Sequence, residues 1–169
     1  MTQKTKNLKV REIMQTDVTT LFPDQTAFDA SVFMASEDVG TVPIVKEDST
    51  LIGIITDRDI VIRCNAVGKD VRKTKIYECM TSNPIRVVPS TSTFDAVVLM
   101  SEYAVRRLPV VENDKLVGIV SMSDIAKHTE PPTEKCINDG TYHLCAFVQL
   151  AKELQRTSHG KQAYCGCDI

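Results

Sequence analysis

Apolar and polar residues alternate with two different periods along the first part of the chain. Phe28, Val32 and Ala35 are spaced by four and three residues, which is typical of a helix. Short β-branched runs separated by polar turns are typical of strands. The order that these patterns predict is β-α-β-β-α. The predicted elements are a strand at 18–22, a helix at 24–38, strands at 42–45 and 51–56, and a helix at 57–66.

The same pattern returns in the second part of the chain. Phe-Asp-Ala at 28–30 recurs at 94–96, and Gly53-Ile54 recurs as Gly118-Ile119. The offset between the copies drops by one residue in the turn before Leu51, where an insertion is tolerated. The second copy therefore predicts the same order of elements. They are a strand at 85–88, a helix at 92–103, strands at 108–111 and 116–121, and a helix that begins at 122.

A duplicated unit of about 55 residues is too small to bury both faces of its own sheet. We therefore predict an α/β (α+β) fold in which two β-α-β-β-α repeats pack sheet to sheet with pseudo-twofold symmetry, with clefts between them. The predicted domains are a polar N-terminal lead at 1–6, repeat 1 at 7–66, a linker at 67–75, repeat 2 at 76–128 and a C-terminal extension at 129–169.

Each repeat carries a motif that resembles a known family. Residues 53–59 (GIITDRD) and 118–124 (GIVSMSD) resemble the signature of CBS domains, glycine-hydrophobic-x-Ser/Thr-x-x-Asp, and the preceding segments 39–43 and 105–109 match it too. A tandem pair of this kind resembles a Bateman module, the sensor unit of the AMP-activated protein kinase gamma subunit. The resemblance implies a regulatory module, not an enzyme, that binds AMP, ADP, ATP or S-adenosylmethionine, forms a homodimer and signals to an unknown effector protein.

The motif has two interpretations at the level of sequence. Thr56 and Asp59, like Ser121 and Asp124, stand where a strand becomes a helix, and a hydroxyl followed three residues later by a carboxylate is also a capping box. In the functional interpretation the helix start and the hydroxyl hold a phosphate, and the carboxylate accepts hydrogen bonds from the ribose hydroxyls. Small apolar residues beside the cleft would accommodate adenine.

The resemblance implies that each ligand is shared between the repeats, which gives two different sites. The first candidate site comprises Thr56, Arg58, Asp59, Ile85, Arg106, Arg107 and Leu108. The second comprises Val18, Thr19, Gly40, Thr41, Val42, Ser121, Ser123 and Asp124. Because arginine binds phosphate through a permanently charged fork, we expect the first site to prefer phosphorylated ligands and the second to bind weakly or to take a less charged adenosyl compound. Alternatively, the arginines belong to a solvated surface or a dimer interface.

The C-terminal extension, 129–169, contains the paired prolines Pro131 and Pro132 near its start, which cannot continue the helix of repeat 2. Apolar residues at helical spacing predict an amphipathic helix at about 141–158, which would cover the module or a dimer partner. A zinc site is an alternative function for this extension, although its Cys-x-Cys spacing is unlike that of a zinc ribbon. Its candidate ligands are His143, Cys145, Cys165 and Cys167, of which the last two are also a candidate redox pair.

Composition narrows the function further. The 169 residues are 43% apolar and carry a net charge of −2 with interspersed signs, so neither a basic stripe for nucleic acid nor a membrane-spanning apolar run is present. We expect a cytoplasmic protein whose six cysteines stay reduced and which requires no cofactor. No nucleophile elbow, P-loop or metal-ligand helix predicts catalysis. The alternative to a nucleotide sensor is a structural or interaction dimer that binds no nucleotide.

Overall fold

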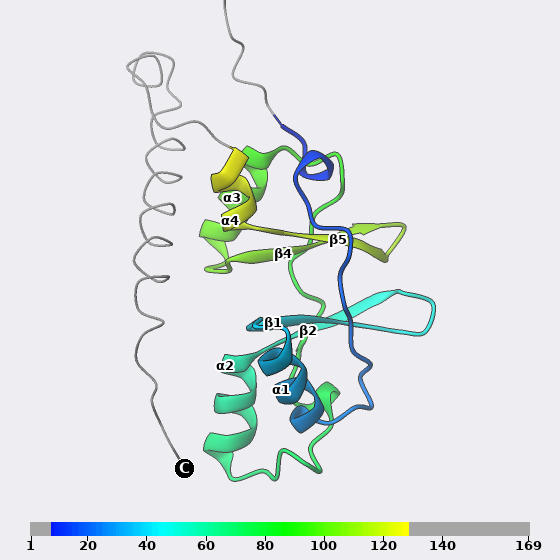
Figure 1. The fold of residues 1–169 in the computed structure, drawn as a ribbon, viewed down its shortest axis with the longest axis vertical. Coiled ribbons are helices and arrows are strands. Elements are labelled where there is room, and N and C mark those ends of the chain that lie inside the picture. The colour runs from blue at the N-terminus through cyan, green and yellow to red at the C-terminus, as the bar shows by residue number, and fades with distance from the viewer. Residues whose placement is uncertain (1–7, 129–169) are drawn as a thin grey trace, which may run out of the picture. The chain divides into compact units, whose positions relative to one another are not determined.

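The computed structural model describes residues 8–128. Its helices and strands are α1 (Ala27–Ser36), β1 (Thr41–Val45), β2 (Leu51–Thr56), α2 (Asp57–Asp59), β3 (Thr81–Ser82), α3 (Thr93–Glu102), β4 (Arg107–Glu112), β5 (Lys115–Ser121) and α4 (Met122–His128) (Figure 1). Short 3-10 helices lie at Val10–Glu12, Asn65–Val67 and Ile76–Glu78, and a π-helix lies at Ile60–Cys64. The predicted mixed α/β class is confirmed. The helix predicted at 141–158 lies outside the described residues.

The first strand predicted in each repeat is reduced to a single bridge, so the expected strands at 18–22 and 85–88 are wrong in extent. Leu21 pairs with Ile44, and Val87 pairs with Val110, both in parallel. Proline explains this limit, because it has no N–H group with which to continue a ladder. Pro23 and Pro89 lie two positions after Leu21 and Val87. Pro43 and Pro109 directly precede the partner residues Ile44 and Val110.

The helix predicted at 57–66 also differs from expectation. Only Asp57–Asp59 is α-helical, and the chain then continues as the π-helix and the 3-10 helix. Asn65 N–H donates to the carbonyls of Ile60 and Val61 at the end of the π-helix. Gly68 then ends the segment with a φ of 75°, a left-handed conformation that glycine adopts without steric cost.

The chain forms two compact units whose limits differ from those of the repeats. The larger unit comprises residues 15–89 and 109–119, and the smaller unit comprises the described residues 8–14, 90–108 and 120–128. The β4–β5 hairpin contributes residues to both units. Among residues 8–128, no helix is long and apolar enough to span a membrane.

The larger unit is built on the antiparallel sheet β1-β2-β3. Figure 1 shows α1 and α2 together on one side of the β1–β2 hairpin. Apolar side chains from these elements and from the segments beside them form the core of this unit, since burial of apolar surface is the main favourable contribution to folding. This core consists of Leu21, Ala27, Ala30, Met34, Val42, Ile44, Ile55, Ile60, Cys64, Ile76 and Cys79.

The smaller unit contains α3 and α4. Ser92 caps α3 by accepting a hydrogen bond from Asp95 N–H at 3.0 Å, and Arg106 carbonyl accepts one from Met122 N–H at 3.0 Å at the start of α4. The buried apolar residues of this unit are Val10, Ile13, Ala96, Val97, Met100, Leu108, Val120, Ile125 and Ala126.

The start of each repeat pairs with the other repeat. In the smaller unit, Lys9 bridges to Ser92, and Val10 N–H donates to the carbonyl of Thr91 at 2.9 Å. In the larger unit the equivalent bridge has the two repeats exchanged. Lys75, just before repeat 2, bridges to Thr26 of repeat 1. The segment that leads into each repeat thus forms a backbone bridge with the residue that caps a helix of the other repeat.

Candidate functional site

The signature of repeat 1 forms a complete capping box at the start of α2. Thr56 Oγ1 accepts a hydrogen bond from Asp59 N–H at 3.1 Å. In return, Asp59 Oδ2 accepts from Thr56 N–H at 2.9 Å and from the Thr56 hydroxyl at 2.7 Å. The capping box that the sequence predicts is therefore formed in this repeat.

The signature of repeat 2 has the same geometry at the start of α4. Asp124 Oδ2 accepts from Ser121 N–H at 2.9 Å and from the Ser121 hydroxyl at 2.5 Å, and Asp124 N–H donates to Ser121 Oγ at 3.2 Å. Asp59 and Asp124 are 9% and 6% exposed. Two buried carboxylates thus occupy equivalent positions in the two repeats.

Capping geometry by itself does not identify a ligand site, because α1 begins in the same way outside the signature. Thr26 and Asp29 make the same three hydrogen bonds at the same distances, 2.9, 2.7 and 3.1 Å. Asp29, however, is exposed, whereas Asp59 is buried. The hydrogen bonds of Thr26 lower the pKa of Asp29 below its usual value of 3.8, as expected for a carboxylate that accepts from a helix start.

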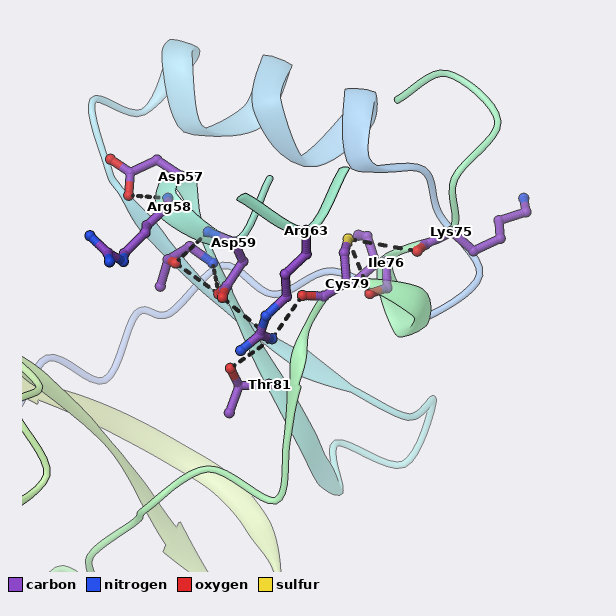
Figure 2. A network of polar contacts seen from close by, with 9 residues as sticks. Asp57, Arg58, Asp59, Arg63, Lys75, Ile76, Cys79 and Thr81 are labelled. Atoms are coloured by element: carbon purple, nitrogen blue, oxygen red, sulfur yellow. Dashed lines mark hydrogen bonds and ion pairs between the residues drawn. The ribbon is translucent and has the colours of Figure 1, made fainter. Parts of the chain in front are cut away.

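Arg63 is a further residue of this site, and the sequence analysis missed it. Its Nη1 lies 3.4 Å from Asp59 Oδ1 and donates hydrogen bonds to Cys79 O at 3.0 Å and Thr81 Oγ1 at 3.1 Å. Figure 2 shows the guanidinium between Asp59 and these two groups. The spacing of four residues between Asp59 and Arg63, typical of ion pairs on a helix, is the signal that could have identified it.

The remaining residues of the first candidate site are distributed over both units. Arg58 lies beside Asp59, and its N–H donates to Asp57 Oδ1 at 2.7 Å (Figure 2). Ile85 belongs to the larger unit. Arg106 is exposed, Arg107 is half-buried and Leu108 is fully buried at the start of β4. The composition of the complete first site stays a prediction.

The second candidate site is likewise drawn from both units. Val18, Thr19 and the segment 40–42 belong to the larger unit, and Ser121, Ser123 and Asp124 belong to the smaller one. Gly40 carbonyl accepts from Asp57 N–H at 3.2 Å. A Cβ at Gly40 would lie 3.1 Å from Asp57 Oδ2, so this close approach favours glycine. The second site as a whole stays a prediction.

A pocket of about 150 Å³ lies within the larger unit. Its lining combines hydroxyl-bearing and apolar residues and includes Val18 of the second candidate site. The lining residues are Thr16, Val18, Thr20, Val45, Ser49, Leu116, Val117 and Gly118. Its hydroxyl groups can hydrogen-bond a polar molecule, but none of its residues is charged at neutral pH.

Two thiols lie next to this network in the core of the larger unit. Cys64 and Cys79 are both buried and are not joined by a disulfide. Burial raises the pKa of the Cys79 thiol to about 12, and its hydrogen bond with Cys64 and the nearby charge of Asp59 add to the effect. Because the thiolate is the reactive form, Cys79 is inert at neutral pH.

Within 8–128, no group of three or more His, Cys, Asp or Glu side chains is arranged to hold a metal ion. The candidate zinc ligands His143, Cys145, Cys165 and Cys167 lie outside the part of the chain that the structure describes.

Two segments of the chain, residues 10–65 and 76–130, each match the family model of the CBS domain. Hypoxic response protein 1 of Mycobacterium tuberculosis is 37% identical over 141 residues, which make up 83% of this chain and 96% of that protein. A crystal structure of Hypoxic Response Protein I with two coordinated zinc ions matches with a TM-score of 0.68 and 36% identity, covering 73% of this chain and 100% of the other.

Two further solved structures of the same fold hold adenosine compounds. CBSX2 in complex with AMP matches with a TM-score of 0.64 and 25% identity, over 70% of this chain and 94% of the other. The CBS domain pair of protein MJ0100, in complex with 5′-methylthioadenosine and S-adenosyl-L-methionine, matches with a TM-score of 0.64 and 29% identity, over 71% and 98%.

Proposed function

Since the chain belongs to the family of CBS-domain proteins, with one copy of the domain in each repeat, we propose that it is a regulatory module that binds adenosine-containing compounds and passes its ligand state to an effector protein. The observation that carries the proposal is the pair of buried carboxylates, Asp59 and Asp124, held in the same way in both signatures. The AMP and S-adenosylmethionine complexes of similar CBS proteins support the ligand class. We assign no catalytic residue.

The chemistry of the residues suggests different ligands for the two sites. An ionised aspartate accepts hydrogen bonds from the vicinal hydroxyls of a ribose, so Asp59 and Asp124 are the proposed ribose ligands. The first site adds Arg58, Arg106 and Arg107, which favour a phosphorylated compound such as AMP, ADP or ATP. The second site has no arginine in its motif and suits a less charged compound such as S-adenosylmethionine.

We further propose that the module forms a homodimer, because closed twofold assemblies are the commonest oligomers. We also propose that it acts in the cytoplasm. A nucleotide-free interaction dimer is the competing function. The two are separated by thermal unfolding with a nucleotide panel: a ligand at 100 times its Kd stabilises the protein by about 2.7 kcal/mol, whereas an interaction dimer gives no shift.

The decisive experiment replaces Asp59 by asparagine and measures AMP binding by calorimetry. Asn keeps an oxygen for the capping bonds of Thr56 but removes the charge, and losing a charge-assisted bond of about 1.5–3 kcal/mol weakens binding ten- to a hundredfold. Asp29→Asn is the matched control, since it alters a capping box of the same geometry outside the signature. Equal AMP affinity in wild type and Asp59→Asn would reject the ribose role.

A second candidate function is zinc binding by the C-terminal extension, which its cysteine and histidine residues favour. The similar Hypoxic Response Protein I holds two coordinated zinc ions. The proposed ligands are His143, Cys145, Cys165 and Cys167, because thiolates and imidazole suit zinc. Elemental analysis of protein purified without a histidine tag tests it. Stoichiometric zinc that is lost in a Cys165→Ser, Cys167→Ser double variant supports the site, and zinc far below one ion per chain rejects it.

A further inference from the structure

The two oxygens of Asp59 are used differently. Oδ2 accepts two hydrogen bonds from Thr56, one from the backbone N–H and one from the hydroxyl. A carboxylate oxygen has about two lone-pair sites, so Oδ2 has none left for a ligand. A ribose that binds Asp59 must therefore donate chiefly to Oδ1.

Oδ1 is the oxygen that Arg63 faces. Nη1 of Arg63 lies 3.4 Å from Oδ1, in an ion pair in which the carboxylate is 12% exposed and the arginine side chain 45% exposed. Both hydrogens of Nη1 are donated to Cys79 O and Thr81 Oγ1, so its contact with Oδ1 is an ion pair without a hydrogen bond, and the positive charge weakens Oδ1 as an acceptor for the ribose hydroxyls. This ion pair thus competes with the ribose that the signature is proposed to bind.

Arg63 keeps other partners when it leaves Asp59. Its Nη1 also donates to Cys79 O and to Thr81 Oγ1, where the chain enters β3 (Figure 2). These bonds are at 3.0 and 3.1 Å, shorter than the ion pair with Asp59. The guanidinium can therefore release Oδ1 and keep both of these hydrogen bonds.

Repeat 2 has a different residue at this position. Aligned on the signature aspartates, Arg63 corresponds to His128, whose Nδ1 lies 2.8 Å from the backbone oxygen of Asp124. The arginine is thus a property of the first signature and not of the capping box that the two repeats share.

We propose that Arg63 is a gate on the first ligand site: its guanidinium pairs with Oδ1 of Asp59, and the ribose of a nucleotide displaces it from this oxygen while its bonds to Cys79 and Thr81 remain. The inference rests on the proposed function and adds its regulation. Since Cys79 and Thr81 lie at the start of repeat 2, the same guanidinium joins the first site to that repeat.

Calorimetry on the full chain, in an Asp124→Asn background that weakens the second site, tests the gate. Arg63→Met keeps the length of the side chain but removes the charge and the donors, and we expect it to bind AMP two- to fivefold more tightly, the range of an exposed ion pair. Arg63→Gln, which retains a donor for Cys79 or Thr81, should behave in the same way. Thr81→Val, the matched control, leaves the ion pair in place and should not tighten binding.

The 2′,3′-dideoxy analogue of AMP supplies the second readout. It has no ribose hydroxyl to compete for Oδ1, so wild type and Arg63→Met should bind it equally. Wild type that binds AMP as tightly as, or more tightly than, Arg63→Met overturns the gate and leaves the proposed function standing. AMP binding by none of the variants overturns both. A gain in affinity that is the same for AMP and its dideoxy analogue also rejects the gate, because it would arise from charge alone.

Discussion

Gly53, the glycine of the first signature, lies in the middle of β2 opposite Ile44 on one side and Ser82 on the other. A Cβ built on Gly53 would overlap the sulfur of Met80 and lie 3.1 and 3.2 Å from its Cε and Cγ, well inside the usual 3.5–4.0 Å between carbon atoms. Met80 belongs to the segment that enters β3. We therefore predict that Gly53→Ala destabilises the protein by displacing Met80.

The size of the effect follows from two opposing contributions. Inserting a methyl group into a filled space costs about 1–3 kcal/mol. Replacing a strand glycine by alanine returns about 0.5–1 kcal/mol, because glycine loses more conformational freedom on folding. Since a methionine side chain is flexible, the net loss in the free energy of unfolding should be about 0.5–2 kcal/mol.

The assay is urea unfolding of wild type, Gly53→Ala, Met80→Ala and the double variant. Removing the Met80 side chain creates the space that the new methyl group needs, so Gly53→Ala should cost nothing in the Met80→Ala background. Met14, at the same position in repeat 1, is the control: Met14→Ala and Gly53→Ala should be additive. Additivity within about 0.5 kcal/mol for the Gly53–Met80 pair would refute the steric explanation.

Two further predictions follow from protonation. Because burial raises the pKa of Cys79 to about 12, iodoacetamide at pH 7.5 should leave Cys79 unmodified in the folded protein and alkylate it after unfolding in urea. Peptide mass spectrometry measures the modification. Rapid labelling of the native protein would contradict the prediction. Thr26→Ala should cost about 1 kcal/mol at neutral pH through loss of the α1 cap. Asp29 has a lowered pKa in the folded state, so the stabilisation by its bonds with Thr26 is present above pH 3.8 and is lost as the pH falls through the folded pKa. Chemical denaturation should therefore show a smaller difference in stability between Thr26→Ala and wild type at pH 3 than at pH 7.

The helices and the β1–β2 hairpin could be predicted because their periodicity and turn residues are local. The helix predicted at 92–103 became α3 with Ser92 as its cap, for example. The first strands could not be predicted, since β-branched residues such as those around Val18 favour extended backbone whether or not a ladder forms. The extent of pairing there depends on prolines in the partner segment, Pro43 and Pro109, as well as on Pro23 and Pro89.

The site shows the same division. Thr56 and Asp59 are neighbours on one helix turn, so their bonds followed from their spacing. Arg63 was within reach of the same reasoning, but its bonds to Cys79 and Thr81 join residues 16 and 18 positions apart, which only the folded chain brings together. The bridges from Lys9 to Ser92 and from Lys75 to Thr26, which exchange the leading segments of the two repeats, could not be predicted either. A repeat in the sequence identifies the two copies but does not say with which copy each segment pairs.

This exchange fixes an order of assembly during synthesis. Residue 8 accepts its hydrogen bond from Thr93, so the first described residues of the chain wait until most of it has been made before their partner exists. The bridge between Thr26 and Lys75 closes a loop of about fifty residues and can form much earlier. Residues 8–10 therefore find their partner later in synthesis than Thr26 does, and a nascent polypeptide stalled before α3 would leave them exposed to other chains.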